Sequence, residues 1–125
     1  MIKEYTSLGF MSGTSGDGVD ASIINTDGNT KYEVIKDQYF EYESDVYKKF
    51  HNIKSQINSI NDLEKFQKDL SELENKITLF HAKIGKEIIN NRKIDVVGFH
   101  GQTIHIFRFY EWNIRRWCRC FNYKI

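Results

Sequence analysis

A twelve-residue run at positions 9–20, Gly-Phe-Met-Ser-Gly-Thr-Ser-Gly-Asp-Gly-Val-Asp, constrains the fold of this chain more than any other feature. It begins with apolar residues and contains four glycines, three hydroxyl side chains and two carboxylates. Glycines and small hydroxyl residues let backbone N–H groups come close to an anion. The run therefore predicts a phosphate-binding turn, in which Asp17 and Asp20 hold a hydrated magnesium ion beside the phosphates.

A glycine-rich β-hairpin is the alternative interpretation, with the Asp17-Gly18 pair making a tight turn. It accounts for the glycines but leaves the hydroxyl side chains unexplained. The run also lacks the Gly-Lys-Ser/Thr ending of a Walker A loop and the spacing of a dinucleotide fingerprint. If it binds phosphate, it belongs to another class of loop.

The run resembles the N-terminal signature of the anhydro-N-acetylmuramic acid kinases, bacterial sugar kinases of the actin, hexokinase and Hsp70 superfamily. Residues 95–105, Asp-Val-Val-Gly-Phe-His-Gly-Gln-Thr-Ile-His, resemble a second signature of that family. The resemblance covers residues 1 to about 105, with both motifs in the family's order. One departure is Gly16, where the family commonly has a bulky apolar residue, so we expect a more flexible turn and a weaker grip on phosphate.

The resemblance implies a nucleotide site on the first motif and a sugar site on the second. ATP would be bound by Gly13, Thr14, Ser15, Gly16, Asp17, Gly18, Val19 and Asp20, and magnesium by Asp17 and Asp20. The sugar would be bound by His100, Gln102 and Thr103. These three residues follow a predicted strand, and ligands of open sheets collect at strand ends. The other histidines, His51, His81 and His105, are interpreted as structural only.

The activity implied by the resemblance is phosphorylation of 1,6-anhydro-N-acetylmuramic acid at O6 by magnesium ATP, with opening of the anhydro ring, in cell-wall recycling. Members of the family are much longer than 125 residues, and their catalytic base lies beyond the end of this sequence. We therefore assign no catalytic residue and expect an amino-terminal fragment with little or no kinase activity alone. The expected partners are the sugar and ATP, and the resemblance admits a homodimer in full-length members.

Hydrophobic patterning predicts an α/β chain with three strands, two helices and a further strand. The strands are expected at 4–11, 20–25, 32–42 and 94–99, and the helices at 44–57 and from a capping box at 61–64 to about 90. This order is that of a partial ribonuclease-H-like lobe, a three-stranded meander crossed by helices to a fourth strand on the opposite edge. The expected core is Phe10, Ile23, Ile24, Val34, Val96 and Val97, with Leu70, Leu73 and Ile77.

The longer helix carries an apolar stripe that favours a different function. Eight apolar residues between Leu63 and Ile88 recur at spacings of three and four. A stripe of this length is typical of a coiled coil or helical hairpin, so a helical interaction protein is the leading non-enzymatic alternative. It leaves both glycine motifs unexplained.

The composition changes near residue 105. Residues 1–105 hold 13 basic and 16 acidic side chains, whereas residues 106–125 hold five basic and one acidic, together with both tryptophans. We therefore expect two regions, a kinase-lobe part at 1–105 and an atypical basic aromatic tail at 106–125. Three interpretations of the tail compete: a nucleic-acid-binding arm, an amphipathic edge of the fold, and out-of-register translation after a frameshift. The third is preferred, so no nucleic-acid partner is expected.

Bulk composition places the chain among globular proteins. Hydrophobic residues make up 40% and charged residues 28%, with a formal net charge of +1. No apolar run approaches the length of a membrane span, and the first six residues have no signal-peptide core. We expect a cytoplasmic protein with no membrane partner.

Overall fold

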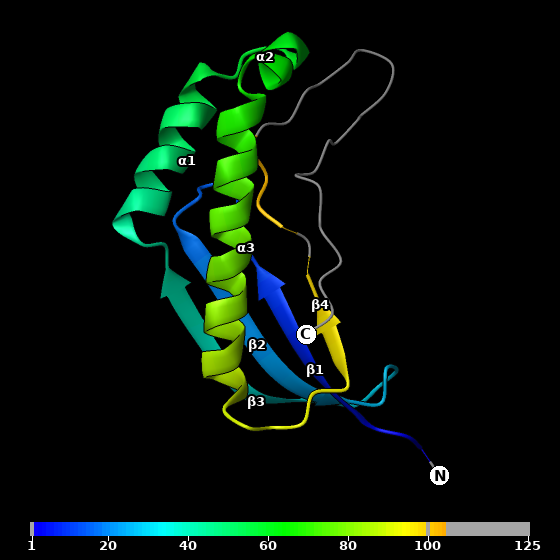
Figure 1. Cartoon of the computed structure of the whole chain (residues 1–125). Helices are drawn as coiled ribbons and strands as arrows, with labels where there is room; N and C mark the ends of the chain where they lie inside the picture. Colours follow the sequence, from blue (N-terminus) through cyan, green and yellow to red (C-terminus); the bar gives the residue numbers. More distant parts are fainter. Residues whose placement is uncertain (1, 100, 105–125) are drawn as a thin grey trace, which may run out of the picture.

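A computed structural model describes residues 2–99 and 101–104. Its elements in chain order are β1 (Tyr5–Met11), β2 (Gly18–Thr26), β3 (Tyr32–Glu41), α1 (Ser44–Gln56), α2 (Ile60–Lys65), α3 (Gln67–Ile89) and β4 (Val96–Gly98). The sheet order is β3-β2-β1-β4, with antiparallel pairs in the meander and β4 parallel to β1 (Figure 1). The predicted meander, helical crossover and fourth strand on the opposite edge are confirmed.

Buried and exposed side chains alternate along β1 and β2, and the buried ones form the part of the core that the sheet contributes. Leu8 pairs with Ile23 and Phe10 with Ala21, and all four side chains are buried. The residues between them, such as Gly9 and Ser22, face the opposite side of the sheet. One face of the hairpin is therefore apolar, and the helices cover this face.

Helix α3 lies across one face of the sheet, and α1 packs beside the first half of α3, beyond the end of β3 (Figure 1). Val46, Phe50 and Ile53 of α1 are buried, and the apolar stripe of α3 is buried through Leu73, Ile77, Phe80, Ile84 and Ile88. Gly85 allows close approach of α3, because a Cβ there would lie 3.2 Å from the Phe10 ring. The stripe that suggested a helical interaction protein is thus used within the chain's own core.

The second predicted helix begins earlier than expected and is divided in two. The Asp62 carboxylate accepts hydrogen bonds from the backbone N–H groups of Asn58 and Ser59, each 2.9 Å long, so the helix start lies at Ser59 and the predicted box at 61–64 is wrong. Ser59 has an extended backbone, as a residue preceding a helix requires. At Phe66 the ψ angle of 17° departs from helical geometry and separates α2 from α3.

The other face of the sheet is open, and this corrects part of the predicted core. Phe10, Ile23, Leu73 and Ile77 are buried as expected, and Ile24 and Leu70 are partly buried. Val34, Val96 and Val97 are instead 46%, 50% and 41% exposed. They lie on the edge strands β3 and β4, and α3 packs mainly over β2 and β3. The prediction of a buried β4 assumed a strand covered on both faces.

Among the residues that the structure describes, no helix is long and apolar enough to cross a bilayer. The predicted tail, residues 106–125, lies outside the described part of the chain. The division at residue 105 therefore stays a prediction.

Candidate phosphate-binding site

The connection between β1 and β2 forms a compact turn in which Thr14 and Ser15 lie on the outside and Ser12 is buried. The Gly16 N–H donates a 3.2 Å hydrogen bond to the Gly13 carbonyl, and Gly16 has a φ of +67°. Thr14 and Ser15, between them, are exposed. A turn of this shape can present backbone N–H groups and hydroxyls to an anion.

Gly16 is buried against α1, which explains why a larger residue does not fit here. A Cβ at this position would lie 2.0 Å from Cε1 of Phe50, whose side chain is fully buried. In this chain Phe50 fills the space beside the turn, and the positive φ adds a second requirement for glycine. The expected flexibility of the turn stays a prediction, but its glycine is a close-packing residue.

The second motif docks directly on the first. Gln102 is buried, and its Nε2 donates to the Gly13 carbonyl oxygen over 2.6 Å. The hydroxyl of Ser12 donates to the Gly101 carbonyl over 3.1 Å, so the two segments are joined in both directions. The Tyr42 hydroxyl donates to Oε1 of Gln102 over 2.9 Å and fixes the amide's orientation.

The three predicted sugar-binding residues differ in what the structure shows of them. His100 lies outside the described residues, and Thr103 is partly buried. Gln102 uses its amide to hold Gly13 and Tyr42 in the structure. Its predicted role toward a sugar stays a prediction, and the structure adds a positioning role for it.

Helix α1 brings two further polar side chains to the turn. Nε2 of His51 lies 3.9 Å from Oδ1 of Asp17, and Nζ of Lys54 donates a 2.6 Å hydrogen bond to the Thr14 carbonyl oxygen. Sequence reasoning gave His51 a structural role only and did not consider Lys54. Their spacing on the helix places them one turn apart, but only the packing of α1 in the folded chain shows that the β1–β2 turn lies beside them.

Acidic side chains gather around Tyr39 at the same end of the sheet. Burial raises the pKa of the Tyr39 hydroxyl first, and the nearby carboxylates of Asp17, Glu41 and Asp20 raise it further. Their combined negative potential would favour a cation here. No group of three or more His, Cys, Asp or Glu in the described ranges is arranged to hold a metal alone. Mg²⁺ needs only one or two carboxylates when phosphates and water complete its shell, so the role of Asp17 and Asp20 in holding it stays a prediction.

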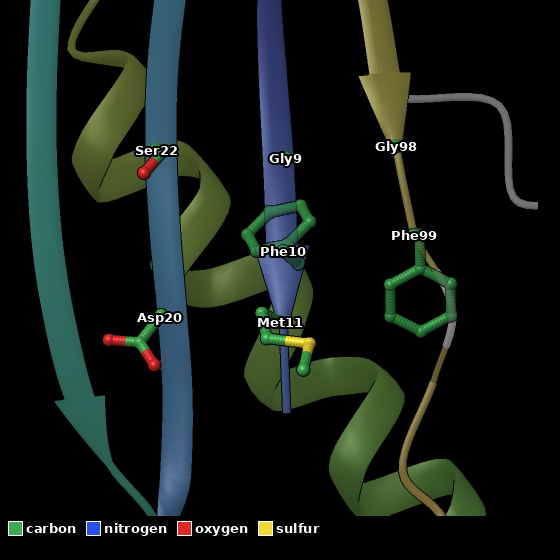
Figure 2. A pocket seen from close by; sticks show the side chains of 7 residues that line it. All are labelled: Gly9, Phe10, Met11, Asp20, Ser22, Gly98 and Phe99. Carbon is green, nitrogen blue, oxygen red and sulfur yellow. The ribbon is translucent and has the colours of Figure 1, made fainter. Parts of the chain in front are cut away.

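A pocket of about 410 Å³ lies near the ends of β1 and β4 and the start of β2. Figure 2 shows Asp20 and Met11 next to each other on β2 and β1, with Phe99 beyond the end of β4. The pocket's lining residues are Gly9, Phe10, Met11, Asp20, Ser22, Gly98 and Phe99.

Comparison with known proteins shows one family. The family model for anhydro-N-acetylmuramic acid kinase matches residues 5–111. The chain is 61% identical over 106 residues to the anhydro-N-acetylmuramic acid kinase of Pelagibacter ubique, and 35% identical over 109 residues to that of Agrobacterium fabrum. These alignments cover 83% of this chain but only 28% and 29% of the relatives. The chain belongs to the anhydro-N-acetylmuramic acid kinase family and spans less than a third of those relatives' length.

Proposed function

We propose that this chain provides the phosphate-binding part of a kinase that transfers the γ-phosphoryl group of ATP to O6 of 1,6-anhydro-N-acetylmuramic acid with opening of the anhydro ring. The observation that carries the proposal is the hydrogen bond from Gln102 to Gly13, which unites the two family motifs in one site. Thr14 and Ser15 remain exposed beside this junction. Family membership supports the choice of reaction.

Each part of the site has a proposed role. The turn from Gly13 to Asp20 binds the phosphates of ATP through backbone N–H groups and hydroxyls. Asp17 and Asp20 hold magnesium, which when bound neutralises charge on the phosphates. The sugar binds at His100, Gln102 and Thr103. A small-molecule sugar and ATP are therefore the proposed partners.

The catalytic base is not assigned to any residue of this chain. Phosphoryl transfer depends on positioning and charge neutralisation, and hydrolytic ring opening also needs a base for the attacking water. The relatives carry more than two thirds of their length outside the matched region. We therefore propose that the 125-residue chain binds magnesium ATP but turns over little or none. A cytoplasmic location, a homodimer and the frameshift origin of residues 106–125 stay predictions.

The test is calorimetric titration of the 125-residue chain with magnesium ATP, repeated with ATP and a chelator. We expect saturable binding that weakens without magnesium. Asp17→Asn should weaken magnesium-dependent binding about tenfold or more, since it removes a charge-assisted contact. Glu87→Gln is the matched control, because Glu87 is an exposed carboxylate in the last turn of α3.

Two outcomes would contradict the proposal. Absence of ATP binding would overturn the phosphate-site assignment, and equal binding by Asp17→Asn would overturn the role of Asp17. A coupled ADP-release assay with the anhydro sugar tests the second part. Turnover by the wild-type chain that disappears in Asp17→Asn would overturn the expected inactivity.

A further inference from the structure

One face of α1 packs against the β1–β2 turn. Phe50 packs on Gly16, His51 approaches Asp17, and Lys54 reaches Thr14. Three residues of the turn are thus contacted by three side chains that lie within about one and a half turns of α1. The turn is supported by Gln102 on its other side. The turn is therefore held by α1 and by Gln102, and among residues 2–99 and 101–104 its basic contacts, from His51 and Lys54, both come from α1.

Lys54 differs from three other lysines of the helical layer. Lys49, Lys76 and Lys83 of the helical layer each pair with a carboxylate, on Glu72, Asp45 and Glu43 respectively. Within the described part of the chain, Lys54 has no carboxylate partner. Its ammonium lies on the Thr14 carbonyl and 5.5 Å from the centre of the Phe50 ring. The positive charge of Lys54 therefore lies at the turn, and among the described residues no acidic side chain neutralises it.

The Lys54 ammonium has further N–H donors that could bind an anion. A lysine carries three N–H donors, and the structure shows one of them used, by the Thr14 carbonyl. Thr14 itself is exposed, and Lys54 is only partly buried, so the remaining donors are at the surface of the turn. The run 9–20 contains no basic residue of its own. A phosphate group bound beside Thr14 would lie near the Lys54 ammonium.

We infer that Lys54 is a phosphate-binding residue of this site, contributed by α1 in place of a lysine within the loop. The inference rests on the proposed function, because it adds a cation to the same ATP site. The Thr14 carbonyl orients the ammonium, and the Phe50 ring supports its aliphatic stem. Charge-assisted hydrogen bonds from the two remaining donors then hold a phosphate oxygen.

The experiment measures the affinity of the 125-residue chain for magnesium ATP by calorimetry in three variants. Lys54→Met keeps an unbranched side chain without the charge and should weaken binding about tenfold or more. Lys54→Arg keeps the charge and should retain most of the affinity. Lys48→Met removes the same charge from an exposed position of α1 and should bind like the wild type.

A second readout separates phosphate contact from support of the fold. The affinity of the wild-type chain should fall as KCl is added, and the fall should be shallower for Lys54→Met because one charge contact is gone. Loss of affinity in both Lys54→Met and Lys54→Arg, with an unchanged salt dependence, would overturn the inference and leave a structural role. Equal binding by wild type and Lys54→Met would overturn it while the proposed function stands. Absence of ATP binding in the wild type would overturn both.

Discussion

The side-chain amide of Gln102 donates a hydrogen bond to the carbonyl oxygen of Gly13 across 89 positions of sequence. A carbonyl can only accept, so Nε2 must face Gly13 and Oε1 must face the Tyr42 hydroxyl, as the structure has them. Two partners thus fix one buried amide in a single orientation. The relation makes the second motif a support for the first, whatever it also contributes to substrate binding.

Replacing Gln102 should destabilise the chain. Gln102→Met keeps the volume but leaves the Gly13 carbonyl and the Tyr42 hydroxyl without this amide, and we expect a loss of about 1–3 kcal/mol in the free energy of unfolding. Urea unfolding followed by circular dichroism measures it. Gln67→Met, at an exposed position that begins α3, should leave the unfolding midpoint unchanged. A wild-type midpoint for Gln102→Met would show that the buried amide contributes nothing.

Adding a methyl group at Gly16 should be more damaging than at Gly28, another glycine with positive φ. Gly16→Ala combines the conformational penalty of positive φ, about 1–2 kcal/mol, with a clash against Phe50 that adds about 1–3 kcal/mol. Gly28→Ala, at a φ of +75° with open space around it, should show the first contribution only. Thermal unfolding compares the two variants. Equal losses would contradict the close packing of Gly16 on Phe50.

The Phe50→Ala background tests the same contact from its other side. Phe50→Ala alone should be strongly destabilising, since the ring is fully buried. In that background Gly16→Ala should lose less stability than in the wild type, because the atoms it clashes with are gone. Strict additivity of the two changes would argue that the ring and the glycine are not coupled.

Asp95 should make the stability of the chain depend on acid. Its carboxylate accepts a 2.9 Å hydrogen bond from the Thr6 N–H, and this bond lowers the pKa of Asp95. The stability that it contributes is present above the unfolded pKa of about 3.9 and is lost as the pH falls through the lower folded pKa. Asp95→Asn should therefore show a smaller loss of stability than the wild type between neutral pH and strong acid.

Urea midpoints measured across this pH range test the Asp95 prediction. Asp69→Asn, at an exposed position in the first turn of α3, should keep the wild-type pH profile. An identical profile for Asp95→Asn and the wild type would mean that the bond to Thr6 does not stabilise the β1–β4 junction.

The open face of the sheet should promote self-association. Val96 and Met11 are 50% and 56% exposed, and β4 is an edge strand among the described residues. Val96→Thr keeps a β-branched residue while reducing apolar surface, so it should lower the associated fraction in sedimentation velocity. Val46→Thr, buried in α1, should instead lower stability by about 1–3 kcal/mol. Unchanged sedimentation of Val96→Thr would exclude this face as the cause of association.

Local patterns in the sequence were sufficient for the meander, the helical crossover and the position of β4. The spacing of Leu73, Ile77 and Ile84 predicts α3, because a helical period shows directly in sequence. The exposure of Val96 and Val97 was not predictable from their own strand, since burial depends on what covers the sheet. The helix start at Ser59 was missed because the Asn61–Glu64 spacing fits the same capping pattern.

The candidate site was predictable in its motifs but not in its supports. The residues of the turn carry their chemistry in their composition, which is why the phosphate hypothesis needs no structure. Lys54 and His51 are ordinary residues of an amphipathic helix when read in sequence. Their nearness to Thr14 and Asp17 arises from the packing of α1 against the turn, which no local pattern specifies.

The bonds of Ser12 and Gln102 also set an order of events during protein synthesis. The β1–β2 hairpin and α1 leave the ribosome early, and their contacts are local enough to form at once. The hydrogen-bond partner of the Gly13 carbonyl, Gln102, is translated 89 residues later. The bonds that join the turn to residues 101 and 102 can therefore form only after residue 102 has emerged.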